Sequence, residues 1–270
     1  LRLFYMIPVF GWIARDTAEK GEENLYYGLA LILSLWGIAI LTFGVPGLYI
    51  PARAMVPVMV ATLVAIAFFY RRRIGELVSG FFAREPETLI FVAKLAVATL
   101  PAVAIGLTAK DRIEAQFSNP VGVGVALLVT GFIVMSTRWT AARASQMTPG
   151  WGTALAIGFA QALAILPGIS RSGSTVAMAL ALGVAPLAAA EFSFLLGIIA
   201  IAGAAVLMIP DLGQLDAGAG TGLAVGGVAA LVSGLLAIWL FVRMLDRSLF
   251  HHWAWYCWIA GGAFLFWTLA

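Results

Sequence analysis

The stretch 164-AILPGISRSGSTVAMAL-180 places a proline–glycine pair, an arginine and four hydroxyl side chains between two apolar segments. Pro167 and Gly168 are typical of a helix end, so we expect one helix to reach about Leu166 and another to begin near Thr175. Each helix would contain about 16 residues and extend about 24 Å, which is short for a bilayer core of about 30 Å. The stretch therefore predicts a re-entrant hairpin, in which two half-helices meet inside a membrane.

The composition of the whole chain excludes a water-soluble globular protein. Of the 270 residues, 62% are hydrophobic and 11% are charged, whereas soluble domains average about 25% charged residues. Uncharged runs long enough to span a bilayer recur along the chain, and no polar linker divides it. We expect residues 1–270 to form a single transmembrane domain: an all-α, polytopic integral membrane helix bundle with at least one re-entrant hairpin.

The charged residues predict both the partners and the topology of the chain. A net charge of +3, with basic residues in short loops, favours contact with membrane lipids and not with nucleic acid. The loop 71-RRRIGELVSGFFAREPE-87 contains four arginines and is predicted to be cytoplasmic, which puts 110-KDRIEAQFSNP-120 and 211-DLGQLD-216 outside. The same alternation puts the loop with Arg138 and Arg143 inside. The chain must then cross the membrane an odd number of times between residue 150 (inside) and residue 211 (outside). Three full spans satisfy this as well as one hairpin plus one span, but helix length favours the hairpin.

The residues after Pro167 predict an anion-binding site. An arginine inside a membrane helix costs about 2.5–3.5 kcal/mol, so Arg171 requires a partner. A guanidinium group suits carboxylate or phosphate oxygens. The hydroxyls of Ser170, Ser172 and Ser174 and the N–H groups of a helix that begins near Thr175 favour the same negative charge. Phosphate is the ligand that fits this combination best.

Other interpretations of these residues remain open. Small and hydroxyl residues pack membrane helices closely and bond to their own helix, and Arg171 could pair with Glu191 or lie in the headgroup layer. Lys94 is either a functional intramembrane charge or a lysine that extends towards the cytoplasmic interface. Gln161 could orient a water or a phosphate oxygen, or it could form a hydrogen bond between helices.

The run P-G-x-S-R-S-x-x-T, with 158-GFAQALAIL-166 before it and 191-EFSFLLGI-198 after it, resembles bacterial undecaprenyl-diphosphate phosphatase of the BacA type. The resemblance covers most of the chain from about residue 57. It implies a multi-pass enzyme of the bacterial inner (cytoplasmic) membrane that hydrolyses undecaprenyl diphosphate, a polyprenyl diphosphate lipid, to the monophosphate carrier of cell-wall synthesis. It also implies an active site that faces the outer side and a divalent cation, Mg²⁺ or Ca²⁺.

Functional residues can be assigned by position in this motif. The resemblance implies catalytic roles for Ser170, Arg171, Ser172 and Thr175. We expect substrate binding by four further residues: Gln161, Gly168, Gly173 and Ser174. A serine nucleophile needs a base, but no histidine precedes His251 in this chain, and His251 and His252 are expected at the membrane interface.

The N-terminal part of the chain departs from the family pattern. The family has a Glu-x-x-x-Glu motif followed by proline, paired serines, glycine and a catalytic histidine, whereas this chain has 19-EKGEENLYYGL-29. Glu19 and Glu23 keep the four-residue spacing, which would put two carboxylates on one helical face and suit a metal ion. The alternative is a solvated charged turn over residues 15–24.

The sequence thus predicts a membrane phosphatase that acts on undecaprenyl diphosphate. An alternative is a transporter or flippase for an anionic lipid or small anion, because a broken helix with a buried charge is also typical of transporters. A third hypothesis is an inactive structural relative. The sequence leaves the oligomeric state open, a homodimer included.

Overall fold

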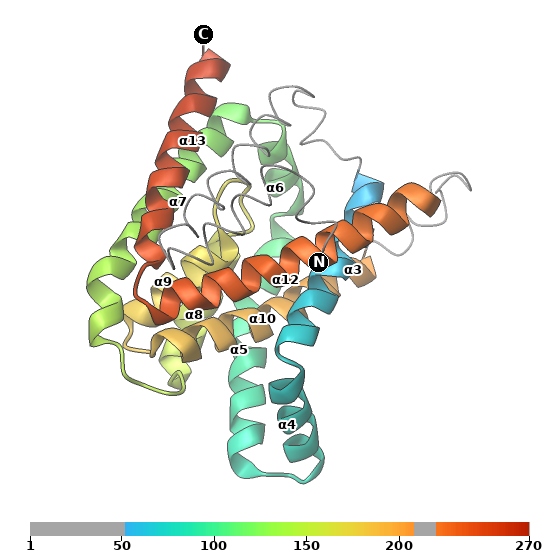
Figure 1. The fold of residues 1–270 in the computed structure, drawn as a ribbon, viewed down its shortest axis with the longest axis vertical. Coiled ribbons are helices and arrows are strands. Elements are labelled where there is room, and N and C mark those ends of the chain that lie inside the picture. Colours follow the sequence, from blue (N-terminus) through green and yellow to red (C-terminus); the bar gives the residue numbers. More distant parts are fainter. Residues whose placement is uncertain (1–51, 208–219, 270) are drawn as a thin grey trace, which may run out of the picture. The chain divides into compact units, whose positions relative to one another are not determined.

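The structure is a computed structural model that describes residues 52–207 and 220–269. The chain from Val56 onward forms one compact unit. The described residues form helices and connecting turns without a β-strand, which confirms the all-α prediction (Figure 1). The prediction of a single domain for the whole chain stays a prediction, because it also concerns residues 1–51.

The helices are α3 (Ala52–Phe69), α4 (Arg71–Phe82), α5 (Pro86–Thr108), α6 (Lys110–Phe117), α7 (Pro120–Thr140), α8 (Trp151–Leu163), α9 (Arg171–Ala181), α10 (Pro186–Leu207), α12 (Gly220–Asp246) and α13 (Trp253–Leu269), with 3₁₀ turns η3 (Ala141–Arg143) and η5 (Phe250–His252).

Three helical segments of the described residues are long and apolar enough to cross a membrane. They are Pro86–Thr108, Pro120–Arg143 and Pro186–Gly203, with 23, 24 and 18 residues. All three begin with proline, whose missing N–H is not needed in the first helical turn and whose φ already suits a helix. Large apolar side chains point outward from the helices, as expected for contact with lipid; they include Leu100, Leu107, Phe132, Ile259, Phe266 and Trp267. The prediction of a polytopic membrane protein is confirmed.

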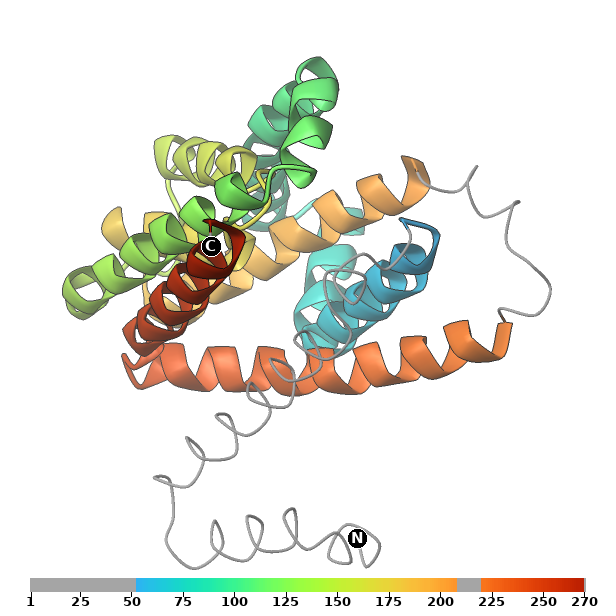
Figure 2. The ribbon, with the colours of Figure 1, turned by 90° about the horizontal axis from the view of Figure 1, so that it is seen from above.

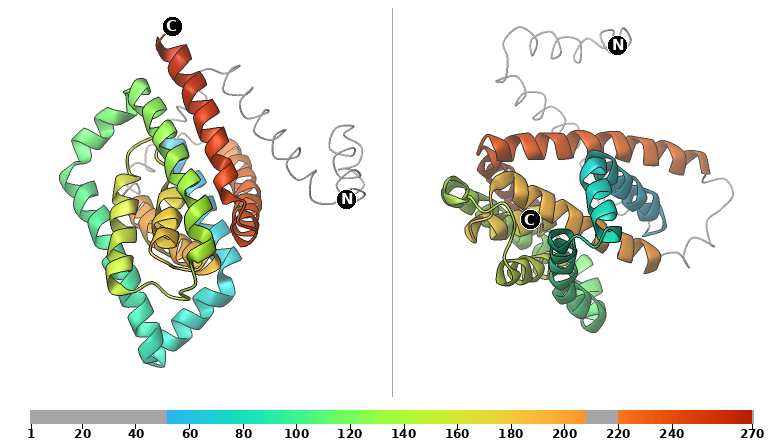
Figure 3. Two further views of the ribbon diagram at one scale, coloured as in Figure 1. Left: turned by 90° about the vertical axis from the view of Figure 1, so that its left-hand side faces the viewer. Right: turned by 90° about the horizontal axis from the view of Figure 1, so that it is seen from below.

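The helices around the signature stretch are packed closely. Helices α7 and α13 run side by side (Figures 1 and 3), and α5 packs against α8, where Gly158 lies against the backbone of Ala98. The short helix α9 contacts α7, α8 and α10. Its apolar side chains join those of α10 in the buried core, and α10 in turn contacts α12 (Figure 2). Helix α9 is therefore held on three sides by other helices.

The break between α8 and α9 lies earlier in the chain than the sequence predicted. Helix α8 ends at Leu163 and not at Leu166, since Pro167 has no N–H for the Leu163 carbonyl and its ring would clash with it. Helix α9 begins at Arg171 and not at Thr175. The two helices have 13 and 11 residues, or about 20 and 17 Å. Both are too short to cross a core of about 30 Å. This supports the re-entrant hairpin, which stays a prediction.

Candidate anion-binding site

The loop between α8 and α9 lies against α7. Gly168 adopts a φ of +94°, a left-handed conformation that only glycine adopts without strain. A Cβ at Gly168 would lie 2.5 Å from the carbonyl oxygen of Val123 and 2.8 Å from the Cβ of Ala126. The positive φ and the close contact with α7 thus explain why residue 168 is a glycine. The predicted contact of Gly168 with substrate would be an additional role and stays a prediction.

Thr130 of α7 holds this loop with a single hydroxyl group. Its Oγ1 donates to the carbonyl oxygen of Gly168 (2.9 Å) and accepts from the N–H of Ser170 (3.1 Å). Thr130 is 2% exposed and the two loop residues are half-buried, so this hydroxyl replaces part of the hydrogen bonding that the loop backbone would otherwise have with water. The sequence analysis missed this residue, because one threonine in a long apolar helix gives no signal of what it contacts.

Ser170 caps the N-terminus of α9. Its Oγ accepts a hydrogen bond from the N–H of Gly173 (3.1 Å), which is the usual role of serine at this position. A Cβ at Gly173 would lie only 2.9 Å from that oxygen. The N–H groups of Arg171 and Ser172 have no acceptor inside the helix, because the first turn lacks preceding carbonyls. These two donors and the helix dipole make this end of α9 favourable for negative charge.

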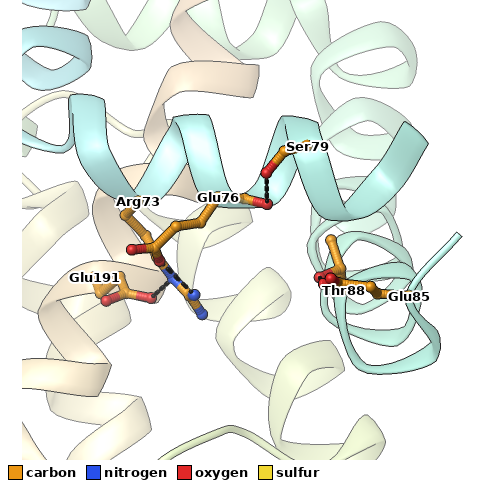
Figure 4. A network of polar contacts seen from close by, with 6 residues as sticks. All are labelled: Arg73, Glu76, Ser79, Glu85, Thr88 and Glu191. Carbon is orange, nitrogen blue, oxygen red and sulfur yellow. Dashed lines mark hydrogen bonds and ion pairs between the residues drawn. The ribbon is translucent and has the colours of Figure 1, made fainter. Parts of the chain in front are cut away.

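Arg171, the first residue of α9, extends its partly buried side chain to α10. One guanidinium nitrogen donates to the carbonyl oxygen of Gly197 (3.2 Å). Within residues 52–207 and 220–269, no carboxylate lies within ion-pair distance of Arg171. The suggested pairing with Glu191 is wrong, because Glu191 Oε1 lies 2.8 Å from Nε of Arg73 (Figure 4). A guanidinium carries five N–H donors, so most of the donors of Arg171 remain for a ligand.

Thr175 links the first turn of α9 to α10. Its Oγ1 donates to the carbonyl oxygen of Arg171 (2.8 Å) and is also hydrogen-bonded to the Oγ of Ser193. A carbonyl can only accept and Thr175 has one hydroxyl proton, so Ser193 is the donor in the second bond. Both side chains are buried, at 1% and 5% exposure. Ser193 is a second residue that the sequence analysis did not single out, although it lies in the quoted segment 191–198.

Gln161 and Ser174 are buried polar residues whose side chains find no hydrogen-bond partner in the described part of the chain. They are 2% and 5% exposed, and both amide atoms of Gln161 and the Oγ of Ser174 are unsatisfied. The hydrogen bond between helices that the sequence left open for Gln161 is therefore absent there. Buried polar groups are nearly always paired. Helices α8 and α9, which carry these two residues, pack together, and the ligand roles of Gln161 and Ser174 stay predictions.

Three other candidates have local partners. Lys94 of α5 lies 5.8 Å from the ring centroid of Trp151 at the start of α8, a distance suited to a cation–π contact. His251 and His252 bond through Nδ1 to the carbonyls of Ser248 and Leu249, each at 3.0 Å. Burial, together with the neighbouring His252, lowers the pKa of His251. These contacts tie the two histidines to their own turn.

The predicted metal ligands Glu19 and Glu23 lie outside the described residues. Among the residues that are described, no group of three or more His, Cys, Asp or Glu side chains comes together to hold a metal ion. The donor set near Arg171 consists of hydroxyl, amide, guanidinium and backbone N–H groups. This set suits an anion, and a cation at this site would have to be bound through residues beyond it.

The fold and the site together define a class: polytopic helical membrane proteins with an arginine and a loop of hydroxyl and N–H donors at the start of a short, largely buried helix. Within this class, the family model "Bacitracin resistance protein BacA" matches residues 28–263, so the chain belongs to that family. The match begins well before residue 57, where the motif resemblance starts, but after Glu19 and Glu23.

Related proteins carry a consistent name. The chain is 34% identical over 220 residues to an "Undecaprenyl-diphosphatase" of Rhizorhabdus wittichii, a match that covers 79% of this chain and 82% of the relative. It is 37% identical over 220 residues to a protein of that name from Methanosphaera stadtmanae (75% and 79% covered). A third, from Methanothermobacter thermautotrophicus, is 41% identical over 169 residues (61% and 93% covered).

Proposed function

We propose that this protein is a membrane phosphatase that hydrolyses undecaprenyl diphosphate to undecaprenyl phosphate, and so recycles the lipid carrier for cell-wall synthesis. The observation that carries the proposal is Arg171: a partly buried guanidinium at a helix N-terminus whose hydrogen-bond acceptor is one carbonyl. Family membership and the name shared by its relatives support the same activity.

In this proposal Arg171 and the first-turn N–H groups of α9 bind the terminal phosphate. Phosphoryl transfer depends mainly on positioning and on neutralising the charge of the phosphate oxygens, which these donors provide. Gln161 and Ser174 would satisfy their buried polar atoms on substrate or on a water that it orders. These residues hold the diphosphate while the lipid chain remains in the membrane.

The three candidate hydroxyls have different partners. Thr175 commits its proton to the Arg171 carbonyl, and Ser170 accepts the capping bond from Gly173. The backbone carbonyl of Ser172 accepts from Thr175, but its side-chain hydroxyl has no hydrogen-bond partner among the described residues. We therefore propose the Ser172 hydroxyl as the group that contacts or attacks the phosphorus. Attack on the terminal phosphorus would form a bond from Ser172 Oγ to phosphorus, break the bridging P–O bond and expel undecaprenyl phosphate, while the serine proton passes to a base. Water would then hydrolyse the phosphoserine to release inorganic phosphate. The base lies outside the group of residues described above.

The proposal also includes a divalent cation, the inner membrane and an outward-facing site. Glu19 and Glu23 are the candidate ligands, since paired carboxylates bind Mg²⁺ and Ca²⁺; the cation would neutralise part of the diphosphate charge. The arginine-rich α4 supports the proposed orientation through the positive-inside rule. A homodimer stays a prediction, which cross-linking in native membranes would check.

The test is phosphate release from undecaprenyl diphosphate by purified protein, with added Mg²⁺ or Ca²⁺ and with a chelator. We expect release by the wild type, loss on chelation, and loss in Arg171→Ala. Arg72→Ala is the matched control because Arg72 is an exposed arginine of α4. No release by the wild type with either cation would show that the function is wrong, and uptake of an anionic lipid by proteoliposomes would then favour transport. Full activity of Arg171→Ala would show that the site is wrong.

A further inference from the structure

We propose that α10 is the positioning element of the site, and that Ser193 and Gly197 hold Thr175 and Arg171 in their working positions. Neither residue belongs to the signature stretch 167–175. This inference rests on the proposed function, since it assigns residues that support the same phosphate-binding group. It follows from the contacts and the spacing of the four residues.

The four residues form two matched pairs across the contact between α9 and α10. Arg171 and Thr175 are four residues apart on α9, so they lie on one face of that helix, as do Ser193 and Gly197 on α10. Arg171 contacts Gly197, and Thr175 contacts Ser193. As the residue number rises on α9 it falls on α10, so the two faces meet in an antiparallel register. One turn of α10 is therefore aligned with the first turn of α9.

Gly197 provides a place for the guanidinium group against the backbone of α10. A Cβ there would lie 2.7, 2.8 and 3.0 Å from the two terminal nitrogens and the central carbon of that group. Any larger residue would therefore displace the end of the Arg171 side chain. The displaced atoms form the end of the flexible Arg171 side chain. A substitution at Gly197 can therefore leave the fold intact, but it moves the guanidinium charge from its position.

The bond to the Gly197 carbonyl orients Arg171 without neutralising it. A hydrogen bond to a neutral carbonyl at 3.2 Å is weaker than a charge-assisted bond to a phosphate oxygen. An aspartate or glutamate in the same place would compete with the substrate. A backbone carbonyl leaves the positive charge available, and the absence of a Cβ at Gly197 lets the guanidinium group reach that carbonyl.

Ser193 fixes the other end of the same turn. By donating to Thr175 it orients a hydroxyl whose own proton is bonded to the carbonyl of Arg171. The bond thus connects α10 to the residue that carries the guanidinium. Because both side chains are almost fully buried, water cannot replace the lost bond, and its removal loosens the first turn of α9.

The experiment for Gly197 compares two substitutions on the same helix. Gly197→Ala should raise both the KM for undecaprenyl diphosphate and the inhibition constant of inorganic pyrophosphate by about tenfold or more, because a misplacement of about 1 Å can cost up to about 100-fold. Gly203→Ala is the control, since nothing lies within 4 Å of its added Cβ. A folding defect would lower the number of active molecules but would leave the inhibition constant unchanged. Equal constants for the two variants would overturn the role of Gly197.

The experiment for Ser193 uses two residues of nearly equal volume. Ser193→Thr keeps the hydroxyl and Ser193→Val does not, so the strain from the added atoms is matched. We expect the threonine variant to have a kcat/KM several-fold higher than that of the valine variant, and equal values would overturn the role of Ser193. If the wild type released no phosphate, the proposed function would fail. Direct binding of pyrophosphate to the wild type and Gly197→Ala would then still decide the positioning role.

Discussion

Two arginines reach α10 from different helices and meet opposite surroundings. Arg73 of α4 lies 2.8 Å from Glu191 and 3.1 Å from Glu76 (Figure 4). Its guanidinium is also 5.3 Å from the ring centroid of Phe91. Arg171 of α9 reaches the same helix at Gly197, where it finds one carbonyl oxygen. The two contacts are six residues apart on α10. One arginine is neutralised by carboxylates and the other keeps its charge.

The difference separates a structural cation from a functional one. Burial lowers the pKa of Arg73, but the hydrogen bonds and charges of Glu191 and Glu76 outweigh it and raise the pKa overall. Arg73 therefore ties α4 to α10, and a second anion would gain little from it. Among the described residues Arg171 has a neutral carbonyl and no carboxylate as partner, and a partly buried charge without a counter-charge favours binding of an anionic ligand.

The largest effect is expected from exchanging each arginine for lysine. Arg171→Lys keeps the charge but loses the planar fork that matches phosphate oxygens, so we expect phosphate release to fall about 100-fold, as for loss of one transition-state donor. Arg73→Lys should leave it within about twofold, since its partners are structural. Steady-state kinetics on both variants measures the effect. Similar losses at the two positions would abolish the contrast.

The next effect concerns the loop that presents Arg171. Thr130→Val should destabilise the protein by about 2 kcal/mol and reduce activity, because the half-buried Gly168 carbonyl and Ser170 N–H each lose a hydrogen bond of about 1 kcal/mol. Thr137→Val is the matched control. Thr137 is also 2% exposed on α7, but it bonds only to the Val134 carbonyl of its own helix. Thermal unfolding in detergent measures both variants, and equal losses would mean that the loop bonds contribute nothing specific.

A smaller effect is expected at the neutralised arginine. Arg73→Ala should cost at most about 1 kcal/mol of stability, since an exposed ion pair contributes little and salt screens it; the two side chains are 36% and 29% exposed. The loss should shrink at high ionic strength. Unfolding of both proteins at low and at high salt provides the measurement. If Arg73→Ala instead lost most of its phosphate release at unchanged stability, Arg73 would have a functional role.

The smallest effect concerns a third cluster of positive charge. Burial and the charges of His252 and Arg138 lower the pKa of His251, while its bond to the Ser248 carbonyl raises it slightly. The folded state thus binds the proton less readily than the unfolded chain, whose histidine pKa is about 6.5. Stability should therefore fall as the pH drops through about 6.5 towards the lower folded value. His251→Gln should weaken this pH dependence, which thermal unfolding at several pH values would measure. If the variant lost more stability on acidification than the wild type, the predicted direction of the His251 pKa shift would be wrong.

The start of α9 shows why the sequence predicted part of the site and not the rest. Three serines in the run 170-SRSGST-175 are suitable N-caps, so the local pattern permits several helix starts. The structure selects Ser170 because Thr130 of α7, forty residues earlier, fixes its backbone N–H. Arg171 was found from sequence because a charge in apolar surroundings stands out. Thr130, Ser193 and Gly197 were not, because small residues are common in membrane helices.

The sequence by itself determined that this protein is a helical membrane protein, because apolar runs of membrane length can satisfy their backbone groups in lipid only as helices. It also predicted an anion site at residues 167–175, because an arginine among hydroxyls at a helix break favours a negatively charged ligand. Tertiary structure alone decided which arginine is neutralised and which stays available. That outcome depends on which residue of α10 each guanidinium meets, and a contact between distant segments is not encoded in the local pattern of either one.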